Sequence, residues 1–202
     1  MMSRFHYASE SDWSIMPYSI RAINGMTLFL PPEAICYYHN HIAYAHQTAD
    51  IDTLLKVTLF VVPVFVGFGA QSADRNTIYF EKVKKYMNLA KSFCRPIIAN
   101  NPVVYHHTPY IGVLETAEWC VLEYATKDRS KGYVGVFRLG SEGNEDIYLL
   151  RLQGVDPAKK YKITLDSKGF EYRAAGEKLM NEGINICLEN INTSELVMYM
   201  QI

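Results

Sequence analysis

The sequence changes character near Asn100, Asn101 and Pro102, and this change constrains the fold more than any other feature. Before it, helical and strand-like patterns alternate, as they do in α/β proteins. After it, short runs of β-branched and aromatic residues are separated by turn clusters, without a helical period. We therefore expect an α/β part over residues 1–103 and an all-β part over residues 104–202.

The first part is expected to alternate between helices and buried strands. Its elements would be a helix over 14–24, a strand over 26–30, a helix that Asp50 or Asp52 caps, a strand over 64–68 and a long helix over 76–94. Residues 33–49 are rich in His and Tyr and are expected to form a connection. Arg95 and Pro96 would end the long helix, because the residue before a proline disfavours helical geometry.

The second part is expected to be an antiparallel β-sandwich, because strand-like runs recur at regular spacing. The runs cover residues 117–125, 132–139, 147–152, 161–165, 184–188 and 196–202. The run over 161–165 alternates most clearly, and it would bury Tyr161, Ile163 and Leu165.

Composition excludes several classes of protein. Apolar residues make up 49% and charged residues 20%, as in soluble globular proteins. The net charge of −1, with scattered Lys and Arg, argues against a nucleic-acid partner. The most apolar run, residues 57–70, is too short to span a membrane, which needs about 20 residues. The four cysteines form no CxxC pair and the N-terminus does not resemble a signal peptide, so we expect a reduced cytoplasmic protein.

Asp12 is the first candidate for chemistry, because it lies on an expected loop that enters a helix. It could act as a general acid or base, or it could cap the helix and contribute about 1 kcal/mol. The local sequence favours the cap. Trp13 and Trp119 could stack on sugar faces, although single tryptophans more often belong to a core.

His39 and His41 are the second candidates. In a strand they could converge on a metal, but no Asp or Glu lies among them and tyrosines surround them. A polar loop that contributes hydrogen bonds to a ligand is the favoured interpretation.

Three groups of residues together carry a family resemblance. Ser11 and Asp12 are followed, nineteen positions after Asp12, by Pro31 at the end of an apolar segment. A helix, strand and helix pattern then runs from Asp50 to Arg95. The tail contains Leu152-Gln153-Gly154-Val155-Asp156-Pro157 with Tyr161, then Gly176, Leu179-Met180, Gly183-Ile184 and Ser194-Glu195-Leu196. Because these three groups occur in this order and at this spacing, the chain resembles the C-terminal part of an α-galactosidase of glycoside hydrolase family 36.

The resemblance implies an incomplete C-terminal portion of a TIM (β/α) barrel over residues 1–103, followed by a C-terminal β-sandwich over 104–202. It implies an enzyme that cleaves terminal α-linked galactose from oligosaccharides with retention, without a cofactor or metal. By the match to the family's Ser-Asp motif, Asp12 would be the general acid/base. Ser11, Trp13, His39 and His41 would contact the substrate.

The chain also departs from the family. The nucleophilic Asp of the family and its Cys/Ser-Gly-Gly stretch are absent, and Trp13 stands where another Asp is frequent. A retaining glycosidase needs two carboxyl groups about 5 to 5.5 Å apart. We therefore expect a fragment that is inactive alone and that acts with a complementing N-terminal piece or within a homo-oligomer. A non-catalytic carbohydrate-binding or structural module, and a related α-glycosidase with another sugar preference, remain alternatives.

Overall fold

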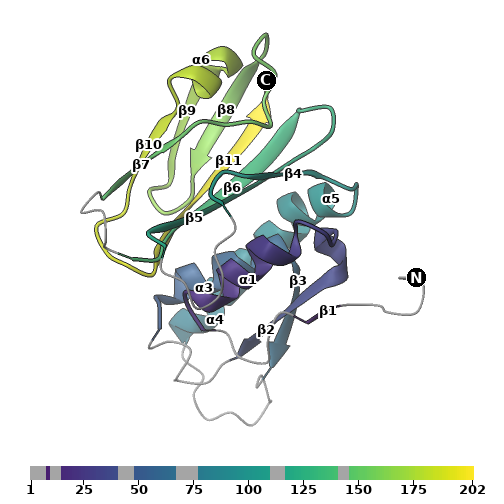
Figure 1. Ribbon diagram of the computed structural model, residues 1–202, viewed down its shortest axis with the longest axis vertical. Helices are drawn as coiled ribbons and strands as arrows, with labels where there is room; N and C mark the ends of the chain where they lie inside the picture. The colour runs from purple at the N-terminus through teal and green to yellow at the C-terminus, as the bar shows by residue number, and fades with distance from the viewer. Residues whose placement is uncertain (1–7, 10–14, 41–47, 67–76, 110–116, 141–145) are drawn as a thin grey trace.

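The computed structural model describes residues 8–9, 15–40, 48–66, 77–109, 117–140 and 146–202. Helices and a small parallel sheet form one end of the molecule, and a larger antiparallel sheet forms the other (Figure 1). The fold is therefore mixed, with mostly antiparallel sheet, in the order that the sequence predicts. Within the described residues, no helix is both long and apolar enough to cross a membrane.

The parallel sheet has three strands in the order β1-β2-β3. A helix lies between successive strands along the chain, as parallel pairing requires. The elements are β1 (Ala8–Ser9), α1 (Tyr18–Met26), η2 (Pro32–Ala34), β2 (Ile35–Asn40), α3 (Ile51–Val57), η3 (Thr58–Phe60) and β3 (Val62–Val66). Asp50 caps α3, since its carboxylate accepts a 2.7 Å hydrogen bond from the Thr53 backbone N–H.

The strand predicted over residues 26–30 is wrong. α1 extends to Met26, and the Thr27 hydroxyl then donates to the carbonyl oxygens of Ile23 and Asn24, both at 3.0 Å. Leu28 and Phe29 are 56% and 74% exposed, so this apolar run is not a buried strand. The strand is β2, within the segment that was expected to be a connection. A short apolar run does not distinguish a helix end from a strand, which explains the error.

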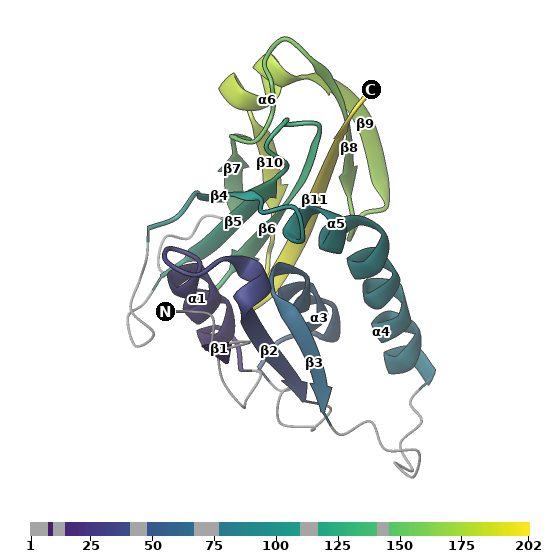
Figure 2. The same cartoon turned by 90° about the vertical axis from the view of Figure 1, so that its right-hand side faces the viewer.

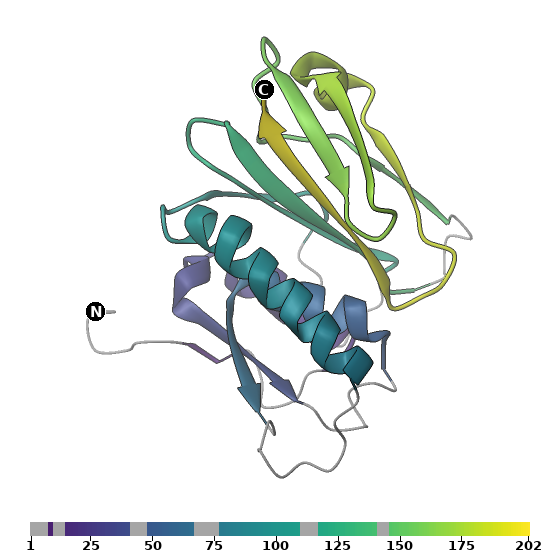
Figure 3. The ribbon, with the colours of Figure 1, turned by 180° about the vertical axis from the view of Figure 1, so that it is seen from behind.

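The long helix continues past Pro96, where the sequence predicted its end. It consists of α4 (Thr77–Leu89), a π-helical turn η4 (Ala90–Cys94) and α5 (Arg95–Ile98), which form one continuous rod (Figure 3). Pro96 lies in the first turn of α5, a position that tolerates a missing backbone N–H. The wider spacing of hydrogen bonds in the π-helical turn fits this local change of the helix.

The antiparallel part has a six-stranded sheet in the order β4-β5-β6-β11-β8-β9 and a two-stranded sheet of β10 and β7. The six predicted strands are all present. β9 and the short helix α6 were not predicted, because β9 is mostly exposed and α6 is short. The elements are β4 (Val103–His106), β5 (Trp119–Ala125), β6 (Lys131–Arg138), β7 (Ile147–Leu150), β8 (Lys160–Leu165), β9 (Phe170–Ala175), α6 (Gly176–Asn181), β10 (Ile184–Cys187) and β11 (Thr193–Gln201).

The six-stranded sheet has a buried core on each of its two faces. Along β5, Leu122 and Tyr124 face the core shared with the helices, whereas Val121 and Ala125 face a second core. The second core also contains Leu150 of β7 and Ile186 of β10, so the small sheet covers that face. Because the first core draws residues from both sides of residue 103, the two parts pack as neighbours. The division into domains at 103/104 stays a prediction.

Phe60 is the centre of the contact between the two parts. Its ring lies 5.2 Å from the ring of Tyr124 and 5.1 Å from that of Tyr133, measured between centroids. The Tyr124 hydroxyl donates a 2.9 Å hydrogen bond to the Phe60 carbonyl, and Tyr133 donates to the Leu59 carbonyl at 2.8 Å. Gly135 is required here, because a Cβ on it would lie 2.7 Å from the Phe60 ring.

Candidate functional site

The three parallel strands run in the same direction, and the carboxyl ends of β2 and β3 lie at one edge of the sheet (Figure 2). Ser9 pairs with Cys36, and Asn40 at the end of β2 pairs with Val66 at the end of β3. The segment that carries Ser11, Asp12 and Trp13 follows β1 directly, and the segment that begins with His41 follows β2. In open α/β sheets and in barrels, ligands bind at this carboxyl edge. The topology therefore starts the segment after β2 at the edge where such sites occur, whereas β1 ends beside Cys36, near the start of β2.

Ser11, Asp12, Trp13 and His41 themselves lie outside the described residues. Their predicted roles as acid/base and as substrate contacts therefore stay predictions.

His39 is the one predicted site residue within the described part of the chain. It is fully buried, and its Nε2 lies 2.8 Å from the hydroxyl of Tyr79 on α4. Its ring stacks on that of Tyr79 and meets the edge of Phe65, with centroids 6.2 and 5.4 Å apart. Burial raises the pKa of the Tyr79 hydroxyl, so this partner stays protonated. These contacts are those of a side chain packed toward α4, and the predicted sugar contact stays a prediction.

Alternation along β2 shows which of its residues face the helices and which face the other side of the sheet, and the sequence did not predict this. Ile35 and Tyr37 join the core that is shared with the helices, on the same face as His39. Cys36 and Tyr38 therefore occupy the opposite face of the sheet. The alternation of side chains along a strand could have predicted these faces, but residues 33–49 were predicted to be a connection and not to contain a strand.

A polar cluster fixes α3 and α4 against the antiparallel sheet. Lys56 of α3 is buried, and its Nζ donates to the Ser167 hydroxyl at 2.6 Å and to the Ser194 carbonyl at 2.8 Å. The Tyr86 hydroxyl of α4 lies 3.0 Å from both the Asp52 and the Asp166 carboxylates. These contacts hold the helices that connect and follow the strands of the candidate site.

Asp52 is charged within this cluster. Burial raises the pKa of its carboxyl, but the hydrogen-bonded Lys82 ammonium and the Tyr86 hydroxyl outweigh burial, so the pKa is lowered. Its role is therefore that of an anchor between α3 and α4, and not of a proton donor near neutral pH.

The tail motif that resembles family 36 surrounds a buried carboxylate, Glu123. One oxygen accepts from the Gly154 N–H at 2.7 Å and the Tyr199 hydroxyl at 2.6 Å. The other accepts from the Gln153 N–H at 3.0 Å and lies 2.6 Å from Nε2 of His107. A Cβ at Gly154 would lie 2.7 Å from Glu123 and 2.2 Å from the Tyr199 hydroxyl. Gly154 therefore allows the chain to pack closely against Glu123 and Tyr199, and the role of this cluster is structural.

The comparisons with known proteins agree with this geometry. Residues 119–198 match the family model described as "Glycosyl hydrolase family 36 C-terminal domain". The galactosidase domain of the α-galactosidase–sucrose kinase AgaSK has 18% identity and a TM-score of 0.67, over 92% of this chain and 24% of its own length. The α-galactosidase of Lactobacillus brevis has 14% identity and a TM-score of 0.70, over 91% and 25%. AgaB of Geobacillus stearothermophilus has 19% identity and a TM-score of 0.66, over 92% and 24%.

Residues 119–198 are therefore related to the C-terminal domain of glycoside hydrolase family 36, and the solved structures share the fold of nearly the whole chain. The predicted resemblance to the C-terminal part of an α-galactosidase of that family is confirmed. The chain spans about a quarter of the length of these solved structures. No curated protein matches it.

Proposed function

We propose that this chain is the C-terminal part of a retaining α-galactosidase-type glycoside hydrolase. In this proposal β1, β2 and β3 are the last strands of a TIM barrel, and the antiparallel part is the C-terminal β-sandwich. The observation that carries the proposal is the parallel sheet. The segment with Asp12 follows β1, the segment with His41 follows the carboxyl end of β2, and the sheet packs directly on a domain of family 36 type.

The substrate class follows from the same relationship. A solved α-galactosidase of Geobacillus stearothermophilus, similar to this chain at 17% identity, was determined in complex with raffinose, and another such structure with stachyose. We extend this to a terminal α-linked galactose on an oligosaccharide for this chain. Trp13 would offer a face for stacking on the sugar ring, and Ser11 and His41 would supply hydrogen bonds.

In this mechanism Asp12 transfers the proton. It protonates the glycosidic oxygen as that bond breaks, and it later takes a proton from the water that releases the sugar. The first step requires a raised pKa, which partial burial or a nearby carboxylate would supply. The attacking carboxylate comes from outside this chain, since the family match provides only Asp12. The isolated chain would then not turn over substrate.

A chimera tests this proposal. AgaB of Geobacillus stearothermophilus, with its matched quarter replaced by this chain, is assayed on 4-nitrophenyl α-galactoside beside the isolated chain. We expect turnover by the chimera only, and Asp12→Asn should lower it by roughly 10² to 10⁴, the usual contribution of a general acid or base. The exposed Glu177 on α6 provides the control, because Glu177→Gln removes a carboxylate far from the carboxyl edge.

Two results would overturn the proposal. Full activity of the Asp12→Asn chimera would remove the acid/base role. Turnover by the isolated chain that Asp12→Asn abolishes would show that no external carboxylate is needed. A folded chimera that binds galactose without hydrolysing the substrate would favour the alternative of a carbohydrate-binding module.

A further inference from the structure

His39 and Phe65 occupy equivalent places on neighbouring strands. Each is the last residue but one of its strand, His39 in β2 and Phe65 in β3, and the two are register partners. Register partners in a sheet have their side chains on the same face. The His39 ring meets the edge of the Phe65 ring, with centroids 5.4 Å apart. A side-chain contact therefore joins β2 to β3 one residue before their carboxyl ends.

Tyr79 of α4 extends this contact to the helix. It lies in the first turn of α4, which begins at Thr77, and it is 1% exposed. Its hydroxyl lies 2.8 Å from the His39 Nε2, and its ring stacks on the imidazole with the planes 15° apart. The hydrogen bond fixes the distance between the two side chains, and the stacking fixes their orientation. The start of α4 is thus held against the carboxyl ends of β2 and β3.

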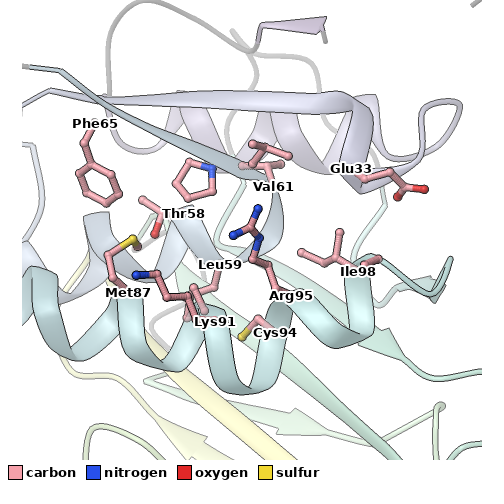
Figure 4. A pocket seen from close by; sticks show the side chains of 14 residues that line it. Glu33, Thr58, Leu59, Val61, Phe65, Met87, Lys91, Cys94, Arg95 and Ile98 are labelled. Atoms are coloured by element: carbon pink, nitrogen blue, oxygen red, sulfur yellow. The ribbon is translucent and has the colours of Figure 1, made fainter. Parts of the chain in front are cut away.

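Farther along the helix, a cavity of about 380 Å³ lies between β3 and the rod formed by α4, η4 and α5. Figure 4 shows Phe65 and Met87 near one end of this cavity and Ile98 toward the other. Where a cavity lies between two elements, close packing of side chains does not fix their separation. We therefore expect the contact between His39 and Tyr79 to matter more for the placement of α4 than it would in a closely packed layer.

We propose that His39 is a positioning residue for the reaction at this edge of the sheet. Through Tyr79 it holds the carboxyl ends of β2 and β3 at a fixed distance from the start of α4. It thereby keeps the edge in the arrangement in which the sugar is cleaved. Its side chain is fully buried against Tyr79, so it serves this role without touching the sugar. The proposal rests on the proposed function, and it adds a residue that acts through the helix.

Removal of single hydroxyl groups in the AgaB chimera tests this role. Tyr79→Phe keeps the ring and removes the group that contacts the His39 Nε2. We expect kcat on 4-nitrophenyl α-galactoside to fall by about tenfold, since a misplacement of about 1 Å costs up to about a hundredfold and the loss of one hydroxyl should displace the edge by less. KM should change by less than about twofold, because the arrangement is needed in the transition state.

Tyr199→Phe is the matched control. It also removes one buried hydroxyl, which donates to Glu123 at 2.6 Å within the antiparallel part. It should lower the thermal midpoint of the chimera and leave kcat unchanged. Two substitutions of His39 complete the set, because His39→Leu removes the hydrogen bond and His39→Gln keeps a group that can bond to the Tyr79 hydroxyl. We expect His39→Gln to retain most of kcat and His39→Leu to lose as much as Tyr79→Phe.

Four results would overturn the positioning role. Unchanged kcat in Tyr79→Phe would show that the contact does not affect the reaction. Equal losses of kcat in Tyr79→Phe and Tyr199→Phe would show a general effect of lowered stability. Equal kcat in His39→Leu and His39→Gln would show that the hydrogen bond is not what matters. An unmodified chimera without turnover would overturn the proposed function, and the role of His39 in that reaction with it. The first three results leave the proposed function intact, so the two failures are distinguishable.

Discussion

The two sheets of this molecule differ in how completely the chain itself surrounds them. The six-stranded antiparallel sheet has one face against the helices and the other against the small sheet, with a core on each side. The three-stranded parallel sheet has helices on one face, a strand edge at β3 and a cavity beside it. The antiparallel part thus has both of its sheet faces packed against other elements of this chain. The candidate site residues belong to the parallel part, whose β3 edge and adjoining cavity are not covered by the described residues.

Buried polar groups show the same difference. Glu123 lies within the antiparallel part, and its partners come from loops and strands of that part alone. Lys56 belongs to α3, but its hydrogen bonds go to Ser167 and Ser194 of the antiparallel part. Lys56 of the parallel part therefore depends on the antiparallel part for its hydrogen bonds. Substitutions can therefore separate the stability that comes from contacts within the antiparallel part from the stability that comes from contacts between the two parts.

The largest effect is expected at Phe60, where the two parts meet. Phe60→Ala removes a buried ring from between Tyr124 and Tyr133, and we expect it to cost about 3 to 5 kcal/mol of unfolding free energy. Urea unfolding followed by circular dichroism measures this loss. Phe29→Ala is the matched control, because Phe29 is mostly exposed and should lose little. A cost at Phe60 as small as that at Phe29 would show that this contact does not join the two parts.

A smaller effect, confined to the antiparallel part, is expected at Glu123. Glu123→Gln replaces one acceptor oxygen by an NH₂ group that faces hydrogen-bond donors, at about 2 to 3 kcal/mol for a buried charged group. Gln153 and Gly154 donate to different oxygens of Glu123, so amide hydrogen exchange should speed up at whichever of the two N–H groups then faces the NH₂ group. Amides of β2 should exchange as before. Equal acceleration in β2 would contradict the view that the antiparallel part is self-contained, and Glu177→Gln should leave both unchanged.

The strands of the antiparallel part could be predicted because their alternation is local. Tyr161, Ile163 and Leu165 are buried while Lys162 and Thr164 are not, as the period of two indicates. β9 was missed because it is an edge strand whose side chains are exposed or only half-buried, so its alternation is weak. The exposed Phe29 shows the opposite failure, because an apolar residue in a helix-ending turn resembles part of a strand.

The candidate site could be predicted only in part. The resemblance selects Asp12, and the segment with Asp12 follows the first strand of a parallel sheet, an arrangement that no local pattern contains. The helix-facing burial of His39 depends on Tyr79, forty positions later in the sequence. Long-range contacts of this kind have no signature in spacing or composition. For the same reason the sequence did not indicate the roles of Lys56 and Glu123.

The smallest effect is expected at Lys56, and it depends on pH. Burial lowers the pKa of its ammonium, and the nearby carboxylates of Glu195 and Asp166 only partly oppose this. The unfolded chain therefore binds this proton more tightly than the folded chain, so wild-type stability should rise with pH between the lowered pKa and about 10.5. Lys56→Met removes this rise and costs about 1 kcal/mol at neutral pH, because the Ser194 carbonyl loses its donor. Urea midpoints measured across this pH range, with the exposed Lys84→Met as control, check both. If the difference in urea midpoint between wild type and Lys56→Met stays constant with pH, the Lys56 ammonium is not desolvated. Water then reaches the contact between the two parts, although Lys56 is buried there.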